Sequence, residues 1–142
     1  MTWLYEGKEY EPVELDPKKT YGFVYLIENL ETGKKYIGKK LLFASKTRQV
    51  NKKKKRYKAE SDWKTYYGSS ESLLADVTKF GKDKFSRTIL RLCATKAECS
   101  YHEAREQFER NVLLSDEYYN LWISVRVRKA HLKGLQINKT VL

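Results

Sequence analysis

Two tyrosines and the residues beside them have the clearest chemical potential in this sequence. Tyr25 lies in a strand-like apolar run, and Tyr36 comes eleven residues later, just before Gly38, Lys39 and Lys40. A tyrosine hydroxyl has a reference pKa of about 10 and is a poor base at neutral pH unless cations lower that value. The two lysines, and a metal ion if one binds, would be such cations. The alternative is that both tyrosines are half-buried strand aromatics, which are common.

The sequence around the tyrosines predicts an antiparallel hairpin. The run at 22–28 is rich in β-formers, the letters NLETG have turn character, and a second short strand is expected at 34–38. The tyrosines would then lie on neighbouring strands, where both hydroxyls can reach one pocket beside Gly38.

The next segment, 44–62, has almost no large apolar side chains, which predicts a loop or a mobile insertion. Its cations would neutralise phosphates and add sequence-independent affinity for nucleic acid. A solvated loop is the alternative, and both interpretations can hold at once. The candidate nucleic-acid-binding residues are Lys40, Lys52, Lys53, Lys54, Lys55, Arg56 and Lys64.

Three further elements are expected after the insertion. A helix is predicted from the helical spacing of Leu73, Leu74, Val77 and Phe80, with Ser69 or Ser70 as its cap and Gly81 at its end. A third strand should follow at 84–93. A second helix should run from a Thr95–Glu98 capping box to about Leu114, with an apolar stripe of Tyr101, Ala104, Phe108 and Val112. This order predicts an α+β domain with a small, mainly antiparallel three-stranded sheet flanked by helices.

Composition narrows the class of protein. The chain has 142 residues, which fits one domain, and its 41% hydrophobic residues are enough to build a core. A net charge of +11 favours a polyanionic partner, nucleic acid first and an anionic membrane surface second. Cys93 and Cys99 are typical of reduced thiols. Neither a signal peptide nor an apolar run of about 18 residues is visible, so we expect a soluble, cytoplasmic protein without a membrane span.

The ordered motifs resemble the GIY-YIG nuclease superfamily. Phe23-Val24-Tyr25 stands in the place of the first triplet, with Phe23 for its glycine, and Tyr36-Ile37-Gly38 is the second triplet. The match covers about residues 22–120 and includes KFGKDKF before the third strand, an acidic helix, and YYN after it. The WKTYYGSS element and the lysine-rich insertion look most like freestanding phage members, often classed as homing endonucleases. The resemblance implies one catalytic domain over 1–142, with an irregular lead-in at 1–20 and a basic tail at 121–142.

The resemblance also implies a metal-dependent endonuclease that hydrolyses DNA phosphodiesters. Tyr25 would be the general base for the attacking water, and Tyr36 would position water or phosphate. Gly38 would allow close approach, and Lys39 would support the tyrosine or the phosphate. Asn120, the last residue of YYN, would contact the active site; the alternative is a turn or cap residue.

The metal ligand and the catalytic arginine each have more than one candidate. The ligand in the superfamily is a glutamate on the later helix, and the resemblance favours Glu103, while Glu109 lies at the opposite edge of the predicted stripe. A single carboxylate suits Mg²⁺ or Mn²⁺. The resemblance also implies a catalytic arginine on a helix after the second triplet, and here the sequence departs most from the superfamily. In its place the insertion offers Arg48, which is nearer the expected distance from the triplet, or Arg56. A solvated arginine in a basic loop is the alternative for Arg48, and Lys64 is a further substitute.

Two other classes of function stay open at this point. A non-catalytic nucleic-acid-binding protein would keep the fold and the basic surface. A basic RNA-associated protein explains the charge but not the ordered tyrosine, lysine, glutamate and asparagine set. We expect DNA as partner and no small-molecule cofactor, with the oligomeric state open and a bacterial host cell as location if the chain is phage-encoded. The tail after Asn120 is short, so specificity would be low or would come from the insertion or a dimer.

Overall fold

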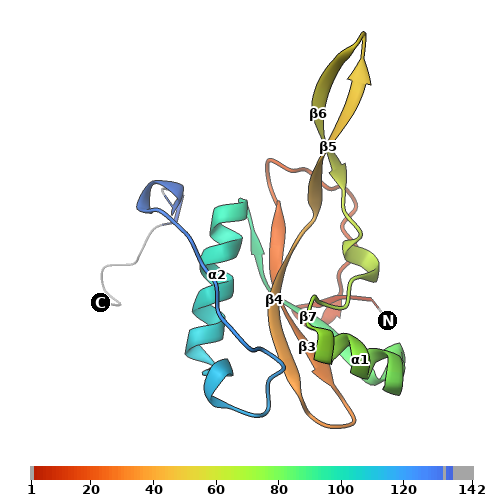
Figure 1. The fold of residues 1–142 in the computed structure, drawn as a ribbon, viewed down its shortest axis with the longest axis vertical. Helices are drawn as coiled ribbons and strands as arrows, with labels where there is room; N and C mark the ends of the chain where they lie inside the picture. The colour runs from red at the N-terminus through yellow and green to blue at the C-terminus, as the bar shows by residue number, and fades with distance from the viewer. Residues whose placement is uncertain (1, 133, 136–142) are drawn as a thin grey trace.

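A mixed sheet of five strands forms the centre of the computed structural model, which describes residues 2–132 and 134–135 (Figure 1). The strand order is β2-β1-β7-β3-β4. All neighbours pair antiparallel except β1 and β7, which are parallel. The strands are β1 Leu4–Tyr5, β2 Lys8–Glu9, β3 Gly22–Asn29, β4 Lys35–Leu41 and β7 Phe85–Cys93. The α+β class is confirmed, but the sheet has five strands rather than the predicted three.

The two additional strands come from the lead-in, which we expected to be irregular. Glu6 and Gly7 both have positive φ, 51° and 80°, which is the backbone of a two-residue hairpin turn. Just before β1, Trp3 is buried, with its ring centroid 4.9 Å from that of Phe23 and 5.2 Å from that of Tyr25. The prediction failed because β1 is short and pairs with a strand more than eighty residues away.

The insertion is a second, two-stranded sheet and not a loop. Strands β5 Phe43–Val50 and β6 Lys53–Glu60 pair antiparallel along their whole length. Asn51 and Lys52 form the turn, with φ of 51° and 64°. This unit, called the ribbon below, extends beyond the sheet and both helices (Figure 1). Its side chains lack an apolar stripe, so the pattern that normally identifies a strand was missing from the sequence.

Two helices cover opposite faces of the five-stranded sheet (Figure 1). Helix α1 Glu71–Phe80 packs its Leu73 and Val77 against the face that carries Tyr25. Helix α2 Lys96–Glu109 packs against the face that carries Ile37. The 3-10 helices are η1 Trp63–Thr65, η2 Lys82–Lys84, η3 Val112–Leu114 and η4 Lys129–Leu132.

No helix in the described part of the chain has the length and apolar character needed to cross a bilayer. Residues 133 and 136–142 of the predicted basic tail lie outside the described residues.

The first helix and its boundaries are confirmed. Ser70 is the N-cap, and its hydroxyl accepts a hydrogen bond from the Leu73 N–H at 3.3 Å. Gly81 ends the helix with φ of 95°, a conformation that glycine adopts without steric cost.

The second helix is shorter than predicted and buries a different face. Asn111 adopts a left-handed conformation, φ 53°, which ends the α-helix well before Leu114. The exposed side chain of Phe108, at 62%, does not belong to the buried face. That face includes His102 and Gln107, so an apolar stripe was the wrong guide.

The predicted capping box is half formed. The Thr95 hydroxyl accepts a hydrogen bond from the Glu98 N–H at 3.1 Å, as expected. The Glu98 carboxylate, however, accepts from the N–H of Ala94 and not from that of Thr95. The helix still begins where the sequence predicts.

Asn111 provides a test of how α2 ends. Asn111→Val places a β-branched residue at positive φ and should lower the free energy of unfolding by about 1–2 kcal/mol. Asn111→Gly should be nearly neutral, because the exposed asparagine side chain makes no cap hydrogen bond. Urea unfolding of the three proteins measures both changes. Equal losses in the two variants would contradict the left-handed conformation.

Candidate active site

A cavity of about 500 Å³ lies at the outer edge of β4. Because β4 is the last strand of the sheet, side chains from both of its faces meet around this edge. The cavity joins residues from β4, from α2, from the start of α1 and from the chain after η3. Its lining includes Tyr36, Lys39, Ser69, Glu103, Gln107 and Asn120.

Tyr25 and Tyr36 come together across Gly38. Tyr25 is directly opposite Gly38 in the β3–β4 register, and the ring centroids of the two tyrosines are 6.2 Å apart. A Cβ at Gly38 would lie 2.5 Å from the Tyr25 hydroxyl oxygen and 2.9 Å from Cε2 of Tyr36. A glycine is therefore required for the Tyr25 ring to lie across β4 as it does.

The segment between η1 and α1 encloses the Tyr25 hydroxyl from the other side. Tyr66 contacts the Tyr25 ring edge-on at 6.1 Å between centroids, and its side chain helps to raise the pKa of Tyr25. Gly68 has φ of 93°, and a Cβ there would lie 3.5 Å from the Tyr25 hydroxyl. The Ser69 and Tyr36 hydroxyls are hydrogen-bonded at 3.2 Å. Sequence reasoning assigned only Lys64 of the WKTYYGSS element to the site and missed Tyr66, Gly68 and Ser69. A glycine directly after two tyrosines was the available signal.

Both tyrosine hydroxyls are harder to ionise than free tyrosine. Burial raises the pKa of Tyr25 well above its ordinary value, and the Tyr66, Tyr36 and Glu103 charges add to the rise. Burial also raises the pKa of Tyr36, against the opposing effect of the Ser69 hydrogen bond. The hydroxyl of Tyr25 is therefore protonated at neutral pH in the protein alone.

The two lysines after Gly38 do not offset this rise. The Lys39 ammonium donates a hydrogen bond to the Ser100 hydroxyl at 2.6 Å. The Lys40 ammonium pairs with Asp62 at 2.6 Å and lies 4.1 Å from the centroid of the Tyr66 ring. The expectation that these lysines lower the pKa of Tyr25 is not met in the protein alone. The groups that shift the pKa of Tyr25 are Tyr66, Tyr36 and Glu103, together with burial, and all of them raise it.

Of the two candidate ligands, Glu103 lines the cavity and Glu109 does not. Glu103 is half-buried, and its carboxylate faces Lys39, whose charge and backbone N–H both favour the ionised carboxylate. Burial raises the pKa of Glu103, while these two effects act in the opposite direction. Glu109 is exposed and pairs with Arg105 at 2.8 Å.

Asn120 lines the cavity, but its amide is engaged with the backbone of β4. Its Oδ1 accepts from the Ile37 N–H at 3.0 Å, and its Nδ2 donates to the Ile37 carbonyl at 2.8 Å. Gln107, which sequence reasoning missed, donates to the same carbonyl at 3.0 Å. These contacts make Asn120 and Gln107 positioning residues for the strand that carries Tyr36 and Gly38.

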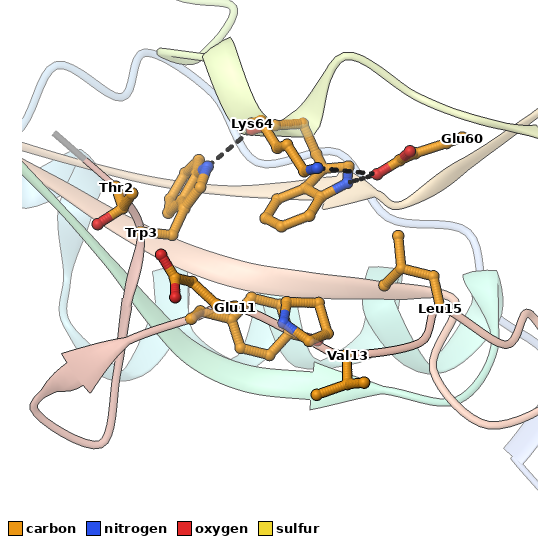
Figure 2. Close-up of a pocket in the computed structure, with 10 residues that line it drawn as sticks. Thr2, Trp3, Glu11, Val13, Leu15, Glu60 and Lys64 are labelled. Atoms are coloured by element: carbon orange, nitrogen blue, oxygen red, sulfur yellow. Dashed lines mark hydrogen bonds and ion pairs between the residues drawn. The ribbon is translucent and has the colours of Figure 1, made fainter.

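The structure does not bring the candidate arginines to the cavity. Arg48 and Arg56 lie on the ribbon, where Arg48 packs 5.5 Å from the ring centroid of Tyr57. Lys64 lies 3.8 Å from Glu60 at a different cavity, of about 580 Å³, as Figure 2 shows. Among the described residues, the cation that lines the Tyr36 cavity is Lys39.

Comparison with known proteins gives one family. The sequence profile described as "Putative endonuclease segE, GIY-YIG domain" matches residues 3–123. A protein of Enterobacteria phage T4 named "Putative endonuclease segE" is 34% identical over 101 residues, which is 71% of this chain and 40% of the phage protein. This chain therefore spans well under half the length of that relative. No solved structure matches the chain.

The environment of Glu103 predicts an effect of its charge on stability. An acid whose pKa is raised by folding destabilises the native state as pH rises from its unfolded value, about 4.5, through the folded one. Glu103→Gln removes this charge, so without divalent ions the variant should melt at a higher temperature than wild type at pH 7–8. The difference should shrink as pH falls toward 4, where both side chains are neutral. Thermal melts against pH measure it.

Glu109→Gln is the matched control for this measurement. Glu109 is exposed and pairs with one arginine, so its replacement should change the melting temperature little. A Glu103→Gln protein that is less stable than wild type at every pH would show that the carboxylate stabilises the fold.

Proposed function

The chain belongs to the family of GIY-YIG domains described for the endonuclease segE, and from that premise we propose that it is a divalent-metal-dependent DNA endonuclease. The observation that carries the proposal is the convergence of Tyr36, Lys39 and Glu103 around one open cavity. Tyr25 does not line this cavity; its buried hydroxyl packs beside Gly38, behind the ring of Tyr36. Hydrolysis of a phosphodiester needs a deprotonated water and positive charge near the phosphate. These residues provide a candidate for each requirement.

Glu103 fits a hard divalent cation. Carboxylate oxygens are the ligands that Mg²⁺ and Mn²⁺ prefer, and burial raises the pKa of Glu103 despite the opposing effect of Lys39, so its charge is only partly compensated. In the described part of the chain, no three His, Cys, Asp or Glu side chains gather as a metal site. Glu103 would therefore hold the ion through one carboxylate, leaving other positions for water and phosphate oxygens. When bound, the ion supplies positive charge against the negative charge that develops on the phosphate.

Tyr25 acts as the general base in this proposal. Its hydroxyl must lose its own proton before it can accept one from water. Burial is the largest cause of the raised pKa that opposes this loss, and the Glu103 charge adds a smaller contribution. A cation on Glu103 cancels this contribution, so ionisation of Tyr25 is coupled to metal binding. Tyr36, held by Ser69, positions water or phosphate. Lys39 provides the phosphate contact for which related enzymes use an arginine, because its ammonium is the cation that lines the cavity.

A non-catalytic nucleic-acid-binding protein is the second candidate. The raised pKa of Tyr25 favours it, because a permanently protonated hydroxyl cannot act as a base. Nicking of supercoiled plasmid in the presence and absence of divalent ions separates the two candidates.

The metal requirement gives one prediction. EDTA should abolish cleavage, and Mg²⁺ or Mn²⁺ should restore it. Glu103→Ala should stop cleavage and leave DNA binding intact, whereas Glu109→Ala should cleave at the wild-type rate, because it lies outside the cavity. If instead Glu109→Ala is inactive and Glu103→Ala cleaves normally, the ligand assignment is wrong.

The tyrosine base gives a second prediction. Tyr25→Phe keeps the buried ring and removes one hydroxyl, so stability should fall by only about 1 kcal/mol. The single-turnover rate should fall by about 10²-fold or more, as for a lost general base. The wild-type rate should rise with pH, because the raised pKa leaves Tyr25 largely protonated at neutrality, and this rise should vanish in the variant.

Tyr36→Phe is the matched comparison. It removes a hydroxyl from the same cavity, and its rate should fall less, with the pH dependence retained. A folded Tyr25→Phe protein that cleaves at the wild-type rate would make Tyr25 a packing residue.

A further inference from the structure

The ribbon is strongly and uniformly cationic. Between residues 44 and 59 it has no acidic side chain, and residues 45–49 and 51–58 are all exposed. Its cations are Lys46, Arg48, Lys52, Lys53, Lys54, Lys55, Arg56 and Lys58. A two-stranded sheet of this kind buries almost no apolar surface and is marginally stable alone.

Repulsion within the ribbon indicates a polyanionic occupant. Arg48 is directly opposite Lys55 in the β5–β6 register, and like charges in that position destabilise a strand pair. Lys52 is held at positive φ in the turn, where glycine would fit without strain, and so places a cation at the tip. Both features are unfavourable in the free protein, and a row of phosphates on either side of the ribbon would relieve the repulsion.

The dimensions of the ribbon select double-stranded DNA among polyanions. Two strands lie about 4.8 Å apart, and strands of eight residues are roughly 27 Å long. The B-DNA major groove, about 12 Å wide, admits a two-stranded ribbon. The major groove of A-form RNA is too deep and narrow for side chains to read its bases.

The two faces of the ribbon differ in chemistry. Paired residues share a face, so Thr47, Gln49 and Arg56 lie on one face together with Lys54 and Lys58. Lys58 is engaged near the base of the ribbon, where its ammonium donates to the Tyr21 hydroxyl. Glutamine and arginine are the side chains that bind adenine and guanine edges through two hydrogen bonds each. The opposite face has Lys46, Arg48, Lys53 and Lys55. The three lysines are point charges suited to phosphates, and the Arg48 guanidinium packs on the ring of Tyr57.

We propose that the ribbon enters the DNA major groove and reads base sequence with Thr47, Gln49 and Arg56. This rests on the proposed function and adds to it a source of specificity close to the cut. Gln49 is eleven residues from Gly38 along the chain, a span of at most about 40 Å. The sequence read by the ribbon therefore lies within roughly twelve base pairs of the phosphate at the Tyr36 cavity.

The test is selection of binding sites from a randomised DNA duplex by the full chain in EDTA, so that no cleavage occurs. We expect a short enriched motif, with methylation protection of guanine N7 in the major groove. Arg56→Lys should lose about tenfold or more of the preference at one base-pair position, and Gln49→Ala should do so at another. Duplex RNA of the same sequence should compete much more weakly than the selected DNA duplex, because it offers phosphates but no readable major groove.

The opposite face provides the matched control. Replacing Lys46, Lys53 and Lys55 by serine should weaken binding to all sequences alike and reduce the salt dependence by about one unit of slope per lost phosphate contact. The enriched motif should not change. Gln49→Ala keeps the charge and should leave the salt slope as in wild type. No variant should melt at a lower temperature than wild type, because these side chains are exposed and loss of Lys55 removes a repulsion with Arg48.

Several results would overturn the proposal: no enriched motif, a motif unchanged by Arg56→Lys and Gln49→Ala, or equal competition by duplex RNA. Failure of the proposed function looks different, because binding is measured without hydrolysis. A protein that selects a motif through the ribbon but never nicks DNA with Mg²⁺ would refute the endonuclease and retain the ribbon as a reader. Cleavage of DNA without any enriched motif would refute the ribbon as a reader of sequence and retain the endonuclease.

Discussion

The outer edge of β4 exposes backbone groups that have no strand partner, and the way they are paired organises the candidate site. The Lys35 N–H donates to the Glu117 carbonyl at 2.8 Å, and the Tyr119 N–H donates to the Lys35 carbonyl at 2.7 Å. Two residues on, Ile37 is paired by Asn120 and Gln107. The next outward N–H, that of Lys39, favours the ionised form of the Glu103 carboxylate. Buried backbone groups are costly when unpaired. Satisfying this edge therefore brings α2 and the YYN segment to the strand that carries Tyr36.

The same edge explains how chemically different groups reach one cavity. Alternate residues of a strand point to opposite faces, so Tyr36 and Gly38 lie on the α1 face and Lys39 lies on the α2 face. In the middle of a sheet these groups would be separated by the backbone, but around an edge strand they meet. The arrangement places the Glu103 charge where it raises the pKa of both tyrosines, an unfavourable interaction that is typical of functional sites.

The elements that sequence predicts well are those with a local signal. The β3–β4 hairpin, α1 and β7 have apolar periodicity and recognisable ends. The two tyrosines of the hairpin could therefore be placed on neighbouring strands from sequence. Both missed hairpins turn through two residues at positive φ, Glu6-Gly7 and Asn51-Lys52, and neither has the Asn-Gly pair that identifies such turns. The contact of Tyr36 with Ser69, and the burial of Gln107 to serve the Ile37 backbone, join distant segments and have no local signature.

The ribbon is joined to the candidate site through consecutive residues of the chain, and this connection suggests how recognition would be linked to cleavage. Strand β4 passes through buried Leu42 directly into β5, and Leu42 is held by its N–H to the Tyr21 carbonyl and by its carbonyl to the Ser61 N–H, both at 2.8 Å. The Ser61 hydroxyl also donates to the Leu41 carbonyl at 2.6 Å. These contacts anchor the base of the ribbon to the end of the strand that carries Tyr36 and Gly38. A duplex seated on the ribbon would therefore present a defined phosphate to the cavity, and register on the DNA would decide which bond lies there.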